Sequence, residues 1–99
     1  MRNRYVINIT GEISNEKNQA FLQYIKDNNL AWWHWLSNTW LIVDTLSNTD
    51  LITLRDKTKE IFEADNLIIQ VDKGNWAGFG PNNENRNMFT WLKENWKNE

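Results

Sequence analysis

The stretch "AWWHWLSNTWLIVD", residues 31–44, decides the fold of this chain. It places four tryptophans and the only histidine in two apolar runs, which are separated by the polar pair Ser37-Asn38. Runs rich in aromatic and β-branched residues on either side of a two-residue connection indicate a β-hairpin, although Ser-Asn is a weaker turn signal than Asn-Gly. We therefore expect one strand at 31–36 and a second at 39–45.

The tight turn also predicts which side chains of the hairpin share a face. It sets Trp35 opposite Trp40 and Trp33 opposite Ile42, and opposed residues of an antiparallel pair point to the same side of the sheet. One face of the hairpin is therefore expected to hold these four bulky side chains. The other face is expected to hold Trp32, His34, Leu36, Leu41 and Val43.

The remaining segments are predicted from their periodicity. Apolar residues that alternate with polar ones indicate a strand, and apolar residues that recur every three or four positions indicate a helix. These patterns predict strands at 4–10 and 66–74, and helices at 11–29, 47–62 and 83–98.

The order strand, helix, strand, strand, helix, strand is the split βαβ pattern of ferredoxin-like folds. We therefore expect an α+β domain at 1–80 that contains a four-stranded antiparallel sheet in the order 4-1-3-2. A C-terminal aromatic-rich helix at 81–99 is expected to pack on the same domain. Two helices cover one face of such a sheet, and the other face stays open unless the last helix or a partner covers it.

The two faces of the predicted sheet differ in composition. The helix-covered core is expected to contain Tyr5, Ile7, Ile9, Trp33, Trp35, Trp40, Ile42, Leu67, Ile69 and Val71. The open face is expected to contain Val6, Asn8, Thr10, Trp32, His34, Leu36, Leu41, Val43, Ile68, Gln70 and Asp72. Large apolar and polar side chains mix on the open face, as they do in protein interfaces, so we expect this face to close a homodimer.

Composition limits the class of protein. A chain of 99 residues with 40% apolar content forms one domain, and the absence of cysteine fits a reducing cytoplasm. The basic start lacks the apolar run of a signal peptide and no segment approaches a membrane span, so we expect a cytoplasmic protein without membrane contact. The formal charge of -2 does not favour direct nucleic-acid binding through phosphate contacts.

Residues suited to catalysis are scarce. His34 is the single histidine, and its simplest interpretation is a partly buried structural residue. The stretch "GNWAGFGP" at 74–81 lacks the Lys and Ser/Thr of a phosphate-binding loop, and we expect it to dock Trp76 and Phe79 on the body of the domain. We predict no catalytic residue, no metal and no cofactor. Helix starts or a solvated surface explain the scattered acids Asp44, Asp50 and Asp56.

The stretches "WWHWLSNTWLIVDTLS" at 32–47 and "LIIQVDKGNWAGF" at 67–79 resemble a group of small bacterial and phage proteins often labelled as the SinR family. These proteins carry a tryptophan-rich hairpin and a late "NWAG", and they are similar to the small CRISPR-associated adaptation nuclease and to the virulence-associated protein D family. The resemblance covers about residues 4–80. It implies a ferredoxin-like fold, a homodimer built partly through the open sheet faces, and an association with nucleic acid.

The resemblance does not extend to the metal site of the related nucleases. In those proteins an aspartate ends the first strand, and its carboxylate can hold a divalent metal for phosphodiester cleavage. The matching position here is Thr10, whose neutral hydroxyl does not supply that charge, and Glu12 replaces it only if the following loop turns back. The sequence therefore favours a noncatalytic protein.

Three function classes remain. The favoured class is a noncatalytic homodimeric binding module of a phage or mobile element, which interacts with a protein or nucleic-acid component of a host defence system such as CRISPR. The second is a nucleotide or small-molecule binder that stacks its ligand on tryptophan, and the third is a degenerate metal-dependent nuclease. The expected binding residues are Val6, Asn8, Trp32, His34, Leu36, Leu41, Val43, Ile68, Gln70 and Trp76.

Overall fold

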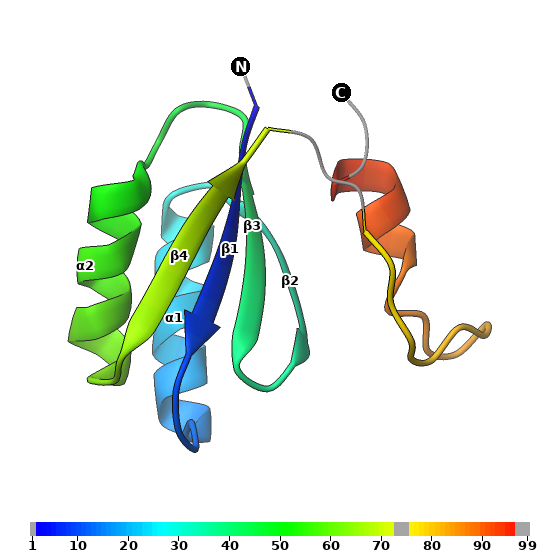
Figure 1. The fold of residues 1–99 in the computed structure, drawn as a ribbon, viewed down its shortest axis with the longest axis horizontal. Helices are drawn as coiled ribbons and strands as arrows, with labels where there is room; N and C mark the ends of the chain where they lie inside the picture. The colour runs from blue at the N-terminus through cyan, green and yellow to red at the C-terminus, as the bar shows by residue number, and fades with distance from the viewer. Residues whose placement is uncertain (1, 73–75, 97–99) are drawn as a thin grey trace.

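A computed structural model describes residues 2–72 and 76–96 of the chain. The predicted α+β fold and the sheet order are confirmed, because the four antiparallel strands lie in the order β2-β3-β1-β4. The helices α1 and α2 lie against one face of the sheet, and the C-terminal segment lies on the other side (Figure 1). The predicted ends of the fourth strand at Gly74 and of the last helix at Asn98 fall outside the described residues. The elements are β1 (Asn3–Ile9), α1 (Asn15–Asp27), β2 (Ala31–Leu36), β3 (Thr39–Asp44), α2 (Leu51–Phe62), β4 (Asn66–Val71) and the short helix η1 (Leu92–Trp96).

Side-chain caps fix where the two long helices begin. The Oγ of Ser14 accepts a hydrogen bond of 3.2 Å from the backbone N–H of Lys17, and the Oδ1 of Asp50 accepts one of 2.8 Å from Thr53. Each bond satisfies a first-turn N–H that has no partner within its own helix. The hydrogen bonds from Thr53 also lower the pKa of Asp50 below its ordinary value. Both helix starts are therefore encoded locally in the sequence.

The main core lies between the sheet and the two long helices. Trp40 is 2% exposed and meets Phe21 of α1 edge-on, with ring centroids 5.0 Å apart. Phe21 in turn packs on Phe62 of α2 at 5.1 Å, so aromatic contacts join both helices to β3. The buried residues of this cluster are Tyr5, Ile7, Ile9, Phe21, Ile25, Leu30, Trp40, Ile42, Leu54 and Phe62.

A β-bulge in β2 changes the predicted faces of the hairpin. Leu36 pairs with Thr39 as the two-residue turn predicts, but Trp33 pairs with Leu41, so His34 and Trp35 together oppose the single residue Trp40. An extra residue in one strand turns every side chain beyond it to the opposite face. The prediction that Trp33 and Trp35 lie under the helices is therefore wrong, whereas it is confirmed for Trp40 and Ile42. The reversed placement also applies to Trp32, which packs against the helix-side core.

The predicted faces of β4 are also reversed. Ile68 pairs with Ile7, so it points toward the helices, and Gln70 does the same through its pairing with Tyr5. The start of β4 sets this register, because the N–H of Thr10 donates to the carbonyl of Asp65 at 3.0 Å. A shift of one residue relative to the expected pairing exchanges the two faces of a strand. The three residues that lie on the open face, instead of in the helix-covered core, are Leu67, Ile69 and Val71.

The C-terminal segment covers part of the open face with a second apolar cluster. The indole Nε1 of Trp33 donates a hydrogen bond of 2.7 Å to the carbonyl of Met88, and Trp76 stacks on Phe89 with ring centroids 5.6 Å apart. The partly buried residues of the sheet and segment that pack against this cluster include Val6, Leu41 and Val71. Its buried members are Trp33, Val43, Met88, Phe89, Leu92 and Trp96.

The predicted helix at 83–98 is shorter in the structure. The side-chain Oδ1 of Asn83 accepts hydrogen bonds of 2.9 Å from the backbone of Asn85 and Arg86, and that of Asn87 accepts from Phe89 and Thr90. Asparagine side chains that bind nearby backbone N–H groups compete with helix formation. Helical structure consequently begins only at residue 90. None of the helices within 2–72 and 76–96 has the length and apolar character that crossing a membrane requires.

Candidate functional site

Part of the open face remains uncovered by the C-terminal segment. Strand pairing aligns Leu36, Thr39, Asn8 and Leu67 in one row across the sheet, and none of these four residues belongs to the second apolar cluster. Leu36 is 50% exposed and Leu67 is 63% exposed, and Ile69 in the next row is 47% exposed. Leu36, Leu67 and Ile69 are named the uncovered strip.

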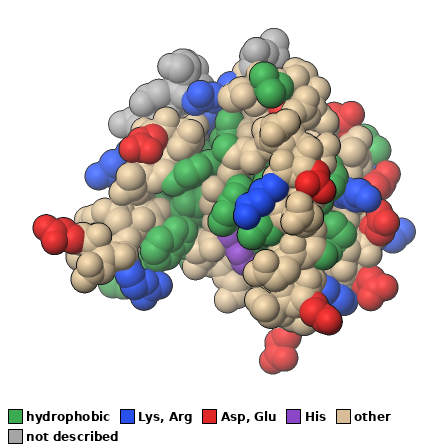
Figure 2. All heavy atoms as spheres, turned by 180° about the vertical axis from the view of Figure 1, so that it is seen from behind, with side chains coloured by type: hydrophobic (Ala, Val, Ile, Leu, Met, Phe, Trp, Pro, Cys, Tyr) green, Lys and Arg blue, Asp and Glu red, His purple; other side chains and the backbone are tan. Residues whose placement is uncertain are grey.

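An aromatic groove runs along β2, which is one of the two outermost strands of the sheet. The groove has a volume of about 450 Å³ and is lined by residues 30–35 and by Trp91. Figure 2 shows hydrophobic side chains gathered in a hollow on this side of the molecule, beside the purple side chain of the single histidine. Within residues 2–72 and 76–96, no backbone hydrogen bond joins the outer edge of β2 to another segment. The groove therefore combines aromatic walls with the free edge of a strand.

Trp35 stands at one end of this groove because of the bulge. Its side chain is 37% exposed, and the guanidinium carbon of Arg86 lies 5.3 Å from its ring centroid. A cation over an aromatic face at this distance is weakly attractive, by about 0.5 to 1 kcal/mol at exposed sites. The contact joins the hairpin to the turn at 82–87.

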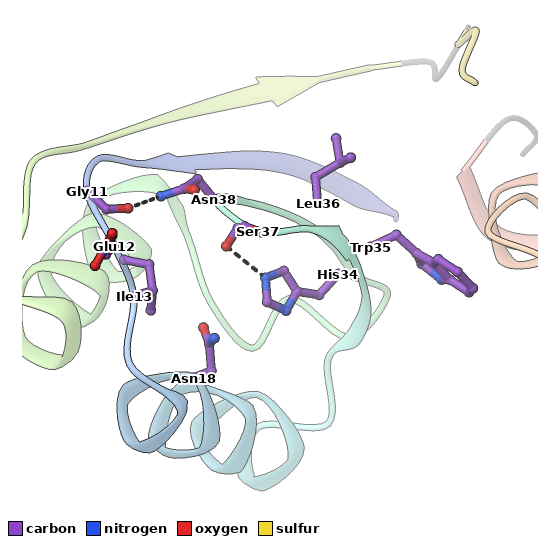
Figure 3. Close-up of a pocket in the computed structure, with 9 residues that line it drawn as sticks. All are labelled: Gly11, Glu12, Ile13, Asn18, His34, Trp35, Leu36, Ser37 and Asn38. Atoms are coloured by element: carbon purple, nitrogen blue, oxygen red, sulfur yellow. Dashed lines mark hydrogen bonds between the residues drawn. The ribbon is translucent and has the colours of Figure 1, made fainter. Parts of the chain in front are cut away.

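A polar pocket adjoins the groove at the turn end of the hairpin. It has a volume of about 620 Å³ and is lined by residues 11–13, by Asn18 and by residues 34–38 (Figure 3). The amide of Asn38 donates hydrogen bonds to the carbonyls of Ile9, at 2.8 Å, and Gly11, at 2.6 Å. These bonds tie the hairpin turn to the loop between β1 and α1. They hold together the two segments that form the pocket walls.

His34 lines both the aromatic groove and the polar pocket. Its ring stacks on Trp40, with centroids 3.8 Å apart and planes inclined by 8°, and its Nε2 lies 3.2 Å from the carbonyl oxygen of Ser37. A carbonyl oxygen only accepts, so this bond requires the proton on Nε2 and leaves Nδ1 of the neutral ring as an acceptor. Burial lowers the pKa of His34, and the bond to Ser37 opposes this only partly, so the neutral ring predominates at pH 7.

Two further side chains give the polar pocket its character. Asn18 points from α1 into the pocket, toward the side on which His34 lies (Figure 3). Its Oδ1 is buried and has no hydrogen-bond partner among the described residues. Glu12 is exposed and is the only charged residue among the described residues that line the pocket and the groove. The pocket therefore contains one acceptor without a partner and one negative charge.

The structure divides the predicted binding residues among several places. Leu36 and Asn8 lie on the uncovered part of the open face, whereas Val6, Leu41 and Val43 pack against the C-terminal segment. Trp76 packs against the same cluster, whereas Phe79 is fully exposed, so the prediction that Phe79 docks on the domain is wrong. The residues predicted for the open face that lie on the helix side instead are Trp32, His34, Ile68 and Gln70.

Several residues of the groove and pocket were not predicted as binding residues. Trp91 belonged to the aromatic pattern of the predicted last helix, but its approach to β2 depends on how the C-terminal segment folds back. Glu12 was considered only as a replacement for the nuclease aspartate, and Asn18 carries no sequence signal. The bond between Asn38 and Gly11 brings the β1–α1 loop beside the hairpin turn, where both residues line the pocket with His34.

Thr10 has a structural partner at the position where the related nucleases carry an aspartate. Its N–H and its hydroxyl both donate to the carbonyl of Asp65, at 3.0 and 3.4 Å. These bonds connect the end of β1 to the start of β4. Within the described ranges, no group of three or more His, Cys, Asp or Glu side chains is placed to hold a metal ion.

The chain matches no protein-family model, no curated protein and no solved structure. The resemblance to the SinR-labelled proteins and their relatives therefore stays a prediction from the hairpin and the "NWAG" motif.

Proposed function

We propose that this protein is a noncatalytic homodimeric binding module of a phage or mobile element, and that it binds a protein component of a host defence system. The observation that carries the binding role is the aromatic groove along the free edge of β2. A concave site with tryptophan walls and a few polar groups is typical of a binding site. The mobile-element source and the host-defence target rest on the family resemblance alone.

A protein target fits the charge of the groove better than a nucleic acid does. Nucleic-acid binding depends on Lys and Arg side chains that neutralise phosphates. Glu12 is the only charged residue that lines the groove or the adjoining pocket in the described part of the chain, and the formal net charge is -2. These charges disfavour a phosphate backbone at this site.

The uncovered strip supports the homodimer part of the proposal. Leu67 and Ile69 expose apolar surface on β4, the other outermost strand, and no charged residue lies between Asn66 and Val71. Burying apolar area is favourable by about 25 cal/mol per Å², and a two-fold contact buries the same strip on both copies. The proposed dimer contact therefore lies on the β4 side of the open face. It does not lie at the centre of the sheet, where the C-terminal segment packs.

Size-exclusion chromatography with light scattering tests the dimer. The wild type should run as a dimer at micromolar concentration, and Leu67→Glu should run as a folded monomer, because the contact would bury a charge against its symmetry mate. Ile52→Glu is the matched control, since Ile52 is 59% exposed on α2, and it should leave the dimer intact. A monomeric wild type would refute the homodimer.

Copurification from the native host tests the binding role. The wild type should retain a defence-system protein, and Trp35→Ala should lose it, because Trp35 lies where the groove meets the pocket. Leu46→Ala is the control, since Leu46 is 64% exposed outside both sites. Equal retention by wild type and Trp35→Ala would show that the groove is not the binding site. Incubation with labelled RNA and DNA plus magnesium or manganese should give no cleavage.

A nucleotide or small-molecule binder is the second candidate. The ring of His34, which stacks on the buried Trp40, and the tryptophans of the groove offer flat surfaces on which a base can stack. Titration of tryptophan fluorescence with the common nucleotides distinguishes this candidate. A saturable change at micromolar concentration, absent in Trp35→Ala, would favour it over a protein target.

A further inference from the structure

We infer that the polar pocket at the hairpin turn receives the side chain of an arginine or lysine, carried by an extended segment of the partner that lies along the free edge of β2. This inference rests on the proposed binding function and adds the chemical class of its ligand. The pocket and the groove meet at His34 and Trp35, which line both. One ligand can therefore occupy the two sites together.

The pocket offers hydrogen-bond acceptors and one negative charge to a ligand. Asn18 contributes a buried Oδ1 without a partner among the described residues, and Glu12 contributes an exposed carboxylate. The Nε2 of His34 is directed to the carbonyl of Ser37, and its Nδ1 points toward the side where Asn18 lies (Figure 3). Guanidinium and ammonium groups are pure donors with positive charge, so they complement this set.

An anion does not fit the pocket, although the pocket lies beside the first turn of α1. The N–H groups of Lys17 and Asn18 already bond the side chain and the carbonyl of Ser14. The ammonium of Lys17 bonds the carbonyl of Phe62 at 3.0 Å and the carboxylate of Glu63 at 3.3 Å, away from the pocket. No Lys or Arg lines the pocket within residues 2–72 and 76–96.

The bulge determines where the partner segment leaves the strand edge. Regular pairing of β2 with β3 holds at Ala31, Trp32 and Trp33 and is interrupted at His34 and Trp35. An added strand can form main-chain hydrogen bonds along the regular part, which spans about 10 Å for three residues. Beyond it the segment meets the pocket mouth, where Trp35 lies with the guanidinium of Arg86 already 5.3 Å from its ring centroid. A basic residue next to about three residues with apolar side chains matches this arrangement.

A displayed library of random heptapeptides, selected on the full-length protein, tests this inference. The enriched peptides should share one Arg or Lys next to apolar residues, and replacing that residue by Gln in the synthetic peptide should weaken binding at least tenfold. Glu12→Gln in the protein should weaken binding by a similar factor, whereas Glu60→Gln, the same charge change on α2, should not. Affinity should fall with added salt, as expected for a charge-assisted contact.

The other outcomes overturn the inference and separate it from the proposed function. The enriched peptides could be apolar and lack a basic residue, with binding that Trp35→Ala abolishes. The groove would then stay a binding site, and the inferred basic side chain would be wrong. Enrichment of no peptide would also overturn the inference, and the copurification experiment would then decide the proposed function by itself. If a labelled single-stranded oligonucleotide binds more tightly than any selected peptide, the ligand of this site is a nucleic acid and not a basic peptide.

Discussion

The imidazole of His34 lies flat on the indole of Trp40, with ring centroids 3.8 Å apart and planes inclined by 8°. This contact exists because the bulge turns His34 toward the helix side of the sheet, where Trp40 is 2% exposed. His34 therefore links the main core to the groove and the pocket that it also lines.

Stability should depend on the protonation of His34. Burial lowers the pKa of His34 below its ordinary value of 6.5, so the unfolded chain binds the proton more readily than the folded one. The free energy of unfolding is then highest above about pH 6.5 and falls as the pH decreases below it. Urea denaturation between about pH 7 and about pH 5 should show a larger loss for the wild type than for His34→Gln. If the difference in unfolding free energy between the two proteins is the same at every pH in this range, the result contradicts the burial of the His34 ring.

Trp40 and Trp35 should differ strongly in their contribution to stability. Trp40→Ala leaves a cavity in the aromatic core and should lower the free energy of unfolding by about 3 to 5 kcal/mol. Trp35→Ala removes a side chain that is 37% exposed and should cost about 1 kcal/mol or less. Chemical denaturation measures both values. Similar losses of unfolding free energy for the two variants would mean that the bulge does not place Trp40 in the core and Trp35 at the surface.

The hydrogen bond from Trp33 should hold the C-terminal segment on the sheet. Trp33→Phe removes the donor to the carbonyl of Met88 and should cost about 1 to 3 kcal/mol. Trp76→Phe is the matched control, because the Nε1 of Trp76 is buried without a partner among the described residues. Limited proteolysis should cut Trp33→Phe faster near residues 82–90 than it cuts the control. Equal rates would show that the bond does not anchor the segment.

Deleting Trp35 should preserve the fold. Without Trp35, His34 would oppose Trp40 directly, and the pairs Trp33–Leu41 and Leu36–Thr39 would remain in register. Circular dichroism and a cooperative thermal transition should therefore be retained. Deleting Leu41 from β3 removes a residue of a central strand, exchanges its faces and should unfold the protein. Unfolding by the Trp35 deletion would mean that the bulge itself is required for stability.

Asp44 should be important for the connection between β3 and α2. Its side chain is fully buried, and its two oxygens accept hydrogen bonds from the backbone N–H groups of Leu46, Asn48 and Thr49, at 2.9 to 3.2 Å. Asp44→Ala leaves these donors without that partner and should lower the free energy of unfolding by about 3 kcal/mol. Asp44→Asn retains one acceptor oxygen and should lose less in the same denaturation measurement.

The sequence was informative where the signal was local. Alternation of apolar residues placed the strands, and the turn at Ser37-Asn38 gave the correct Leu36–Thr39 pair. Asp50 was given a helix-start or surface role, and its bond to Thr53 shows that it caps α2, which begins at Leu51 and not at residue 47 as predicted. Asp44 was given a helix-start or surface role, but it is buried because three backbone donors of the next loop converge on it. No sequence pattern near Asp44 indicates that these three backbone N–H groups surround its side chain.

The order of the strands and helices, and with it the sheet topology, was determined by the sequence alone, because periodicity and caps act over a few residues. The faces of β2 and β4 were decided only by the tertiary structure, since a single inserted or shifted residue exchanges them. Trp33 illustrates the reason, because its indole bonds the carbonyl of Met88, 55 positions later in the chain. The groove and the pocket depend on such distant contacts, so their residues become neighbours only when the chain is folded.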